Sequence, residues 1–232
     1  MDAALRLCVR NFGALFAVAL ASELCAYALD VALETRAGED VGTLVSLVVG
    51  AAFSPLLIGT TLAAVEGRGT VAWGALRRLW PVGVVYLIAN LAGIVGLVLL
   101  IVPGVILLTK WSVAPVVALA EGRRVRDSFR RSAGLVRGLF WHVLGALTCW
   151  WGAVAAELGV DRIETLLLPH APRLVEFLKY VTGAFFAPLS ACVAVMLYMD
   201  LLARKEGADL LDPLPQRWPA AVTPGRTDPA DV

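Results

Sequence analysis

Six long apolar segments, separated by short polar stretches, dominate the hydrophobic pattern of this 232-residue chain. They are residues 12–33, 41–65, 81–102, 104–120, 139–160 and 176–202. A helix needs about 20 apolar residues to cross the hydrocarbon core of a bilayer, and all of the segments except 104–120 reach that length. The sequence therefore predicts an all-α polytopic membrane protein whose six transmembrane helices form three hairpins.

The composition excludes a water-soluble fold. Hydrophobic residues make up 59% of the chain and charged residues 17%, and the mean hydropathy is +0.78. Soluble domains carry about 25% charged residues. The formal net charge of +1 says little about partners, because the charges are segregated along the chain.

The composition of the chain changes after residue 203. Residues 1–203 form the predicted membrane domain, and residues 204–232, rich in proline and acidic residues, are predicted to be a disordered cytoplasmic tail. At the other end, a secretory signal peptide competes with the first span, since Ala19-Leu20-Ala21 could serve a signal peptidase. The apolar run continues well past that tripeptide, which favours a transmembrane helix.

Basic residues concentrate between the fourth and fifth predicted spans. The arginines there are Arg123, Arg124, Arg126, Arg130, Arg131 and Arg137. Apolar residues recur among them at spacings of three or four, and so share one face of a helix. These apolar residues are Val125, Phe129, Ala133, Val136 and Phe140. The pattern predicts an amphipathic helix at the membrane interface, and residues 66–81, with Trp73 and Trp80, predict another.

The distribution of basic residues also predicts the orientation of the chain. If the N-terminus is cytoplasmic, the inner segments hold 15 Lys and Arg residues and the outer loops hold only Arg36, Arg162 and Arg173. Cytoplasmic loops of membrane proteins carry an excess of Lys and Arg. Both termini are therefore predicted to be cytoplasmic.

A loose repeat relates the three predicted hairpins. Each is preceded by a basic lead-in, ALRLCVRNF, ALRRLWP or SAGLVRGLF. The returning helices carry a small residue before proline, at Ser54-Pro55, Ala114-Pro115 and Ala187-Pro188, and then reach Glu66-Gly67, Glu121-Gly122 and Glu206-Gly207. The spacing from proline to glutamate differs among the three. The repeat predicts three parallel hairpins around a pseudo-threefold axis, all entering from the cytoplasm.

Three charged residues inside the predicted spans are candidates for function: Glu23, Lys110 and Glu157. A charged group at membrane depth is costly unless it is paired, neutralised or hydrated. Glu23 either joins helices as a hydrogen-bonded carboxyl or belongs to an ion or substrate site. Lys110 either extends toward the interface or pairs with one of the two glutamates.

The stretch after the fifth span, residues 161–173, is predicted to be an outer loop. If the preceding helix extends into it, Glu157, Asp161 and Glu164 share one helical face, with His170 nearby. A solvated rim is favoured over a cation site, because metal ligands need a defined geometry. No metal and no cofactor is predicted.

Three blocks of the sequence carry a family resemblance. They are PGVILLTKWSVAPVVALAEG, DSFRRSAGLVRGLFWHVLG and YMDLLARKEGADL. With the layout of residues 1–210, they resemble the bacterial membrane domain found fused to some glycerophosphoryl diester phosphodiesterases, and its stand-alone relatives. The resemblance implies a six-span, multi-pass protein of the bacterial plasma (inner) membrane. It transfers no catalytic residue, because nothing in the chain corresponds to the phosphodiesterase domain.

Two functions are compatible with the sequence. In the first, a non-catalytic membrane module binds anionic lipid headgroups or a membrane partner through its six clustered arginines. In the second, a transporter or lipid exporter uses Glu23, Lys110 and Glu157 along a polar path between proline-broken helices. An enzyme is not predicted, because the chain has no HExxH, P-loop or GxSxG motif. The predicted partners are membrane lipids and not nucleic acid, and homo-oligomers are left open.

Overall fold

The computed structural model describes residues 9–37, 42–65, 71–99 and 101–207, which are helical almost throughout. In chain order the elements are α2 (Phe12–Ala37), α3 (Gly42–Val65), the 3₁₀ helix η2 (Trp73–Arg78), α4 (Leu79–Leu99), α5 (Ile101–Trp111), α6 (Ala114–Ala120), α7 (Val125–Val136), α8 (Phe140–Leu167) and α9 (Pro172–Glu206). No strand occurs in these ranges, so the predicted all-α class is confirmed for them.

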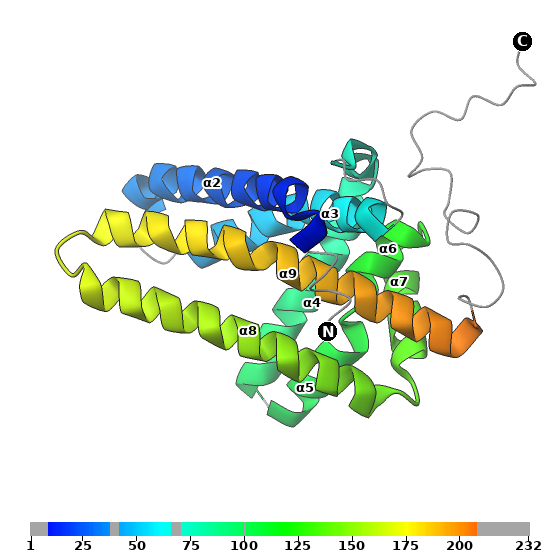
Figure 1. Ribbon diagram of the computed structural model, residues 1–232. Coiled ribbons are helices and arrows are strands. Elements are labelled where there is room, and N and C mark those ends of the chain that lie inside the picture. Colours follow the sequence, from blue (N-terminus) through cyan, green and yellow to red (C-terminus); the bar gives the residue numbers. More distant parts are fainter. Residues whose placement is uncertain (1–8, 38–41, 66–70, 100, 208–232) are drawn as a thin grey trace, which may run out of the picture.

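Long helices that run along a common direction determine the shape of the molecule. Helix α2 packs against α3, and α9 packs against both α2 and α8. Figure 1 shows α2, α8 and α9 extended in the same direction, with the turn between α8 and α9 at one end and α6 and α7 toward the other. Helices α4 and α5 pack on each other and turn away from that direction. The predicted arrangement of three parallel hairpins is therefore not confirmed.

Four helical segments are long and apolar enough to cross a membrane. They are Phe12–Leu33, Leu44–Val65, Val102–Ala120 and Arg173–Glu206. Each matches one of the six predicted spans. The helical class is thus confirmed in the part of the chain that the structure describes, and the four segments are compatible with the predicted polytopic membrane protein.

The main hydrophobic core lies where α6 meets its neighbours. Helix α6 is buried along nearly its whole length, and it packs against α3, α4, α7 and α9. Leu62, Val85, Leu135 and Leu201, one from each of these helices, are fully buried in the same cluster. The basic helix α7 is therefore fixed to the bundle through this core.

The predicted fourth span is not one continuous helix. Pro103 and Gly104, at the boundary between the third and fourth predicted spans, lie in the first turn of α5, where proline is tolerated because its N–H would have no partner. The helix then breaks at Ser112 and resumes with α6 at Ala114. The break lies just before Pro115, which lacks the N–H needed to continue the helix.

The predicted boundaries of the outer loop and of the C-terminal tail are also wrong. The outer loop expected over residues 161–173 is shorter, because α8 continues to Leu167 and α9 already begins at Pro172. No glycine or proline occurs between Asp161 and Leu167 to end the helix. Helix α9 likewise continues through Glu206, into the first residues of the predicted tail, and ends at Gly207 with φ +61°. The rest of that tail, 208–232, lies outside the described residues.

Proline inside helix α3 is accommodated by a neighbouring hydroxyl group. Pro55 lies within α3 and cannot donate to the carbonyl of Ala51. The Ser54 hydroxyl donates to that carbonyl instead, at 3.0 Å. Ser and Thr side chains can satisfy backbone groups freed by proline in this way. In the first of the three predicted repeats, the small residue before proline thus satisfies the carbonyl that proline leaves without a donor.

Candidate functional site

Helix α7 is held against the bundle by a face that the sequence pattern located only in part. Its buried residues are Ser128, Ser132, Leu135 and Val136, and the Ser132 hydroxyl donates to the Lys110 carbonyl at 2.8 Å. Two serines therefore lie in the interface where an apolar stripe was expected. Small polar residues allow close packing when their hydroxyl groups are satisfied by backbone carbonyls.

Two of the six arginines on this segment are used in a salt-bridge network. Arg131 donates to Glu121 at 3.0 Å and to Glu206 at 2.5 Å, and Arg123 donates to Glu121 at 2.5 Å. Partial burial disfavours the charged guanidinium, but the hydrogen bonds and charges of Glu206 and Glu121 outweigh it and raise the pKa of Arg131. Tyr198 also donates to Glu121, at 3.3 Å. The network ties the middle of α7 to the ends of α6 and α9.

The two glutamates of this network belong to the repeat found in the sequence. Glu121-Gly122 ends α6 and Glu206-Gly207 ends α9, and both glycines have positive φ, +66° and +61°. Glycine adopts this left-handed conformation without steric cost, so it is suited to the end of a helix. Glu66-Gly67, the third member, lies outside the described residues.

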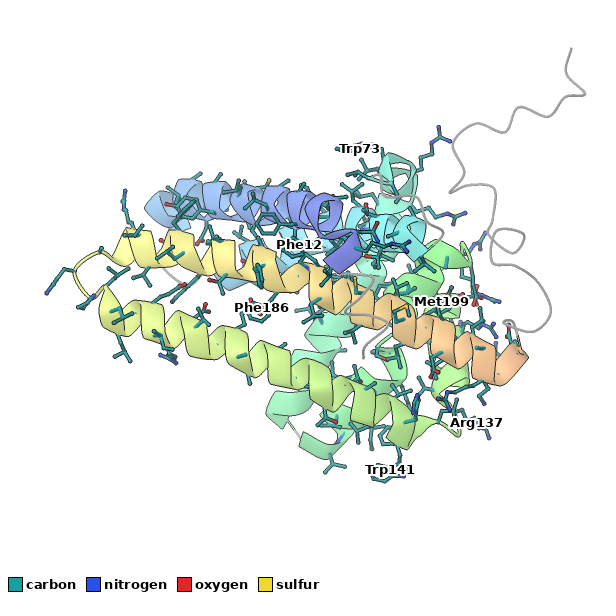
Figure 2. All side chains as sticks on the ribbon, in the orientation of Figure 1. Phe12, Trp73, Arg137, Trp141, Phe186 and Met199 are labelled. Atoms are coloured by element: carbon teal, nitrogen blue, oxygen red, sulfur yellow. The ribbon has the colours of Figure 1, made fainter. Side chains whose placement is uncertain are left out.

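The other four arginines form an exposed surface, which we call the open arginines: Arg124, Arg126, Arg130 and Arg137. None of them forms a salt bridge with a carboxylate among the residues that the structure describes. Trp141 follows them in the chain and is 80% exposed. Figure 2 shows Arg137 and Trp141 close together at the surface. The sequence pattern did not distinguish the open arginines from the paired ones.

Exposed tryptophans also lie on η2 and in the first turn of α4. Trp73 is 67% exposed and Trp80 is 79% exposed. Between them, Arg77 is exposed as well. Tryptophan is typical of the membrane–water boundary, where its ring is partly apolar and its N–H is hydrated. The exposure of these residues agrees with the interfacial role predicted for the segment.

Glu23 and Glu157 come together in the structure. Gly183 of α9 lies between them, and a Cβ atom at this glycine would be 3.5 Å from Glu157 Oε1 and 3.7 Å from Glu23 Oε2. The absence of a side chain at Gly183 thus leaves room for two carboxyl groups from α2 and α8. Lys110 does not join them, because its exposed side chain belongs to α5 and lies outside the lining of the cavity described next.

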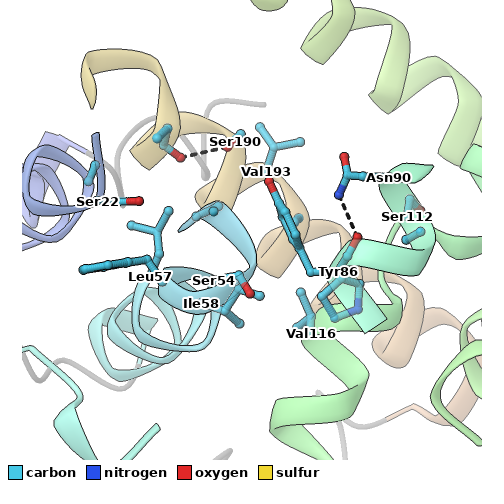
Figure 3. Close-up of a pocket in the computed structure, with 18 of the residues that line it drawn as sticks. Ser22, Ser54, Leu57, Ile58, Tyr86, Asn90, Ser112, Val116, Ser190 and Val193 are labelled. Atoms are coloured by element: carbon cyan, nitrogen blue, oxygen red, sulfur yellow. Dashed lines mark hydrogen bonds between the residues drawn. The ribbon is translucent and has the colours of Figure 1, made fainter. Parts of the chain in front are cut away.

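A cavity of about 270 Å³ lies inside the bundle next to Glu23. Its walls come from α2, α3, α4, α5, α6, α8 and α9, and most of the lining is apolar. Polar groups reach it at Ser22, Glu23, Ser54, Tyr86, Asn90, Ser112 and Ser190, several of which Figure 3 shows. This cavity was not predicted from the sequence, although three of its lining residues, Ser54, Pro115 and Ala187, belong to the small residue–proline pairs of the repeat.

The acidic face of α8 points toward α9 more than toward solvent. Thr182 donates to Glu164 at 3.1 Å, and one oxygen each of Asp161 and Glu164 is buried without a hydrogen-bond partner. The predicted solvated rim is therefore partly enclosed. Within the described residues, no group of three or more His, Cys, Asp or Glu side chains is arranged to hold a metal ion.

Comparisons with protein-family models, curated proteins and solved structures found no match to this chain. The similarity to the membrane domain of glycerophosphoryl diester phosphodiesterases therefore rests on the three sequence blocks alone. Function is therefore inferred from the arrangement of residues in the structure.

Proposed function

We propose that this chain is a non-catalytic integral membrane protein that binds anionic lipid headgroups through the open arginines of α7 and its flanks. One observation carries the proposal. Of six arginines in one segment, Arg123 and Arg131 are paired with carboxylates, whereas the open arginines are exposed without such a pair in the described part of the chain. The paired arginines hold the segment in place, and the open arginines are available to bind a ligand.

Lipid phosphates fit this surface chemically. Guanidinium groups match the geometry of phosphate oxygens, and each basic residue near an anionic membrane surface contributes about 1 kcal/mol to binding. Four open arginines together would supply about 4 kcal/mol. The neighbouring exposed ring of Trp141 suits the same headgroup layer.

The proposal includes the topology that gives the open arginines access to lipid. We place six crossings in a bacterial plasma membrane, with both termini and α7 on the cytoplasmic side. Four of these crossings correspond to the apolar segments of membrane length, and the excess of basic residues on the inner segments supports the orientation. The cytoplasmic leaflet is also the surface where anionic lipids attract basic segments.

Native mass spectrometry of the protein extracted with a small patch of membrane would test the proposal. The triple variant Arg124→Gln, Arg126→Gln and Arg130→Gln is expected to lose most of the anionic lipid that the wild type retains. The matched control is Arg162→Gln with Arg173→Gln, which removes two exposed arginines predicted to lie on the outer side. Equal retention of anionic lipid in all three proteins would contradict the proposal, and loss of a co-purifying protein instead would replace lipid with a protein partner.

Transport is a second candidate, favoured by a separate observation. Glu23 lines an internal cavity and meets Glu157 at Gly183, and part of the wall comes from the break between α5 and α6 and from α3 and α9, which contain proline. Broken helices around a central site are typical of secondary transporters. Transport would require at least that a ligand binds saturably in this cavity.

A further inference from the structure

Four polar side chains of the cavity wall each donate a proton to the backbone and keep an acceptor oxygen. The hydroxyls of Ser54, Ser112 and Ser190 each donate their proton to a backbone carbonyl three residues earlier, at 3.0, 3.0 and 2.8 Å. The Asn90 amide donates to the carbonyl four residues earlier, at 2.9 Å, as Figure 3 shows. A hydroxyl whose proton is used retains its lone pairs, and the Asn90 oxygen accepts only. A ligand in this cavity therefore meets oxygen atoms that favour a donor or a positive charge.

The carboxyl of Glu23 adds an ionisable acceptor to this wall. Glu157 lies close behind it at Gly183, and neither glutamate forms a salt bridge with Lys, Arg or His in the described ranges. A buried carboxylate needs an opposite charge or strong hydrogen bonds to offset the loss of hydration. An anionic ligand would add a like charge, and an apolar ligand would leave the carboxylate without a partner.

Aromatic side chains form another part of the lining. Phe53, Tyr86, Trp111 and Trp151 all border the cavity. The face of an aromatic ring attracts a cation, by about 2 kcal/mol or more when the cation is desolvated. The remaining wall, formed largely by Val, Leu, Ile and Ala side chains, suits hydrocarbon groups.

We infer that this cavity binds a small hydrophobic organic cation, such as an amine or quaternary ammonium carrying an aromatic or alkyl group. Glu23 neutralises the charge, the rings contact the cationic centre and the aliphatic wall covers the hydrocarbon part. The volume of about 270 Å³ is close to the lower end of ligand pockets, which hold about 300–1,000 Å³, so the ligand is small. This site is separate from the open arginines.

Binding of benzyltrimethylammonium to the full chain in detergent would test the inference. Equilibrium dialysis gives the amount bound, and the fluorescence of the tryptophans that border the cavity reports its occupancy. Neopentylbenzene is the matched neutral probe, because a carbon atom replaces the nitrogen and the shape is unchanged. The wild type is expected to bind the cation saturably and at least about tenfold more tightly than the neutral probe, and Glu23→Gln is expected to abolish that preference.

A second pair of variants keeps the test independent of the charge change at Glu23. Ala194→Phe fills the cavity and should abolish binding, whereas Ala156→Phe, at an exposed position of α8, should not. Cation binding should also persist in the triple arginine variant, so failure here is distinguishable from failure of the lipid proposal. Equal affinity for the two probes in the wild type, or cation binding unchanged by both Glu23→Gln and Ala194→Phe, would overturn the inference.

Discussion

At the scale of single residues, Asp30 shows how a carboxyl is held in an apolar helix. Its surface is only 9% exposed, and it accepts a hydrogen bond of 3.0 Å from the Tyr180 hydroxyl of α9. A buried carboxyl without such a partner would be strongly unfavourable. The hydrogen bond therefore fixes α2 against α9 at the end of the bundle opposite to α7.

Replacing Tyr180 by Phe removes this bond and leaves the ring in place. We expect the free energy of unfolding to fall by about 1 kcal/mol, the usual contribution of a hydrogen bond between membrane helices. Thermal unfolding in detergent would measure the change. The control is Tyr27→Phe, whose ring packs edge-on against Tyr180 but whose hydroxyl has no hydrogen bond among the described residues. Equal loss in both variants would contradict the role of Asp30.

At the scale of elements, the close approach of α4 to the backbone of its neighbours depends on glycine, as Gly83 and Gly96 show. A Cβ atom at Gly83 of α4 would lie 2.9 Å from the Ala51 carbonyl of α3, and one at Gly96 would lie 2.9 Å from Gly104 Cα of α5. Both distances are too short for a real side chain. Small residues allow helix backbones to approach closely in membrane proteins, so α4 can pack tightly on both neighbours.

Gly83→Ala should therefore destabilise the protein, although alanine is the better helix former. We expect a loss of about 1–3 kcal/mol in the free energy of unfolding, as for overpacking in a dense core. Gly145→Ala is the matched control, because nothing lies within 4 Å of a Cβ at that position. It should leave stability unchanged or raise it slightly. A Gly83→Ala protein as stable as the control would show that the contact between α3 and α4 is looser.

The salt-bridge network makes a separate prediction about α7. Arg131→Gln leaves Glu121 and Glu206 without their shared partner, and we expect stability to fall by about 1–2 kcal/mol, since the network is only partly buried. The neighbouring Arg130→Gln, at an exposed position, should change stability by no more than about 0.5 kcal/mol. Chemical unfolding in detergent would compare the two. Equal changes would mean that the network adds nothing to the docking of α7.

The sequence predicted the elements better than their ends and contacts. The lengths of the apolar segments predicted the long helices, and the spacing of Val125 and Phe129 predicted α7. Both patterns follow from the local geometry of a helix. The meeting of Glu23 with Glu157 was not predictable, since it depends on the rotation and depth of α2 and α8 around Gly183. The pairing of Arg131 was missed for the same reason. Its partner Glu206 lies far away in the sequence and reaches it only through the packing of α9.

At the scale of the whole molecule, charge is distributed unequally between the two ends of the long helices. The open arginines and the salt-bridge network lie toward the end where α6 and α7 are found, and the α8–α9 turn lies at the other (Figure 1). An excess of Lys and Arg at one end is the feature that orients membrane proteins, with that end in the cytoplasm. The lipid proposal depends on it, because the open arginines must face the cytoplasmic leaflet.

Cysteine labelling from each side of the membrane would show which side the open arginines face. The four native cysteines would first be replaced by serine, and Arg126→Cys or Leu166→Cys introduced one at a time. Leu166 is 79% exposed near the end of α8, at the end of the bundle proposed to lie outside. A membrane-impermeant maleimide is predicted to label Leu166→Cys in intact spheroplasts and Arg126→Cys only in inside-out vesicles. Labelling of both positions from the same side would contradict the topology and, with it, the binding of cytoplasmic lipid by the open arginines.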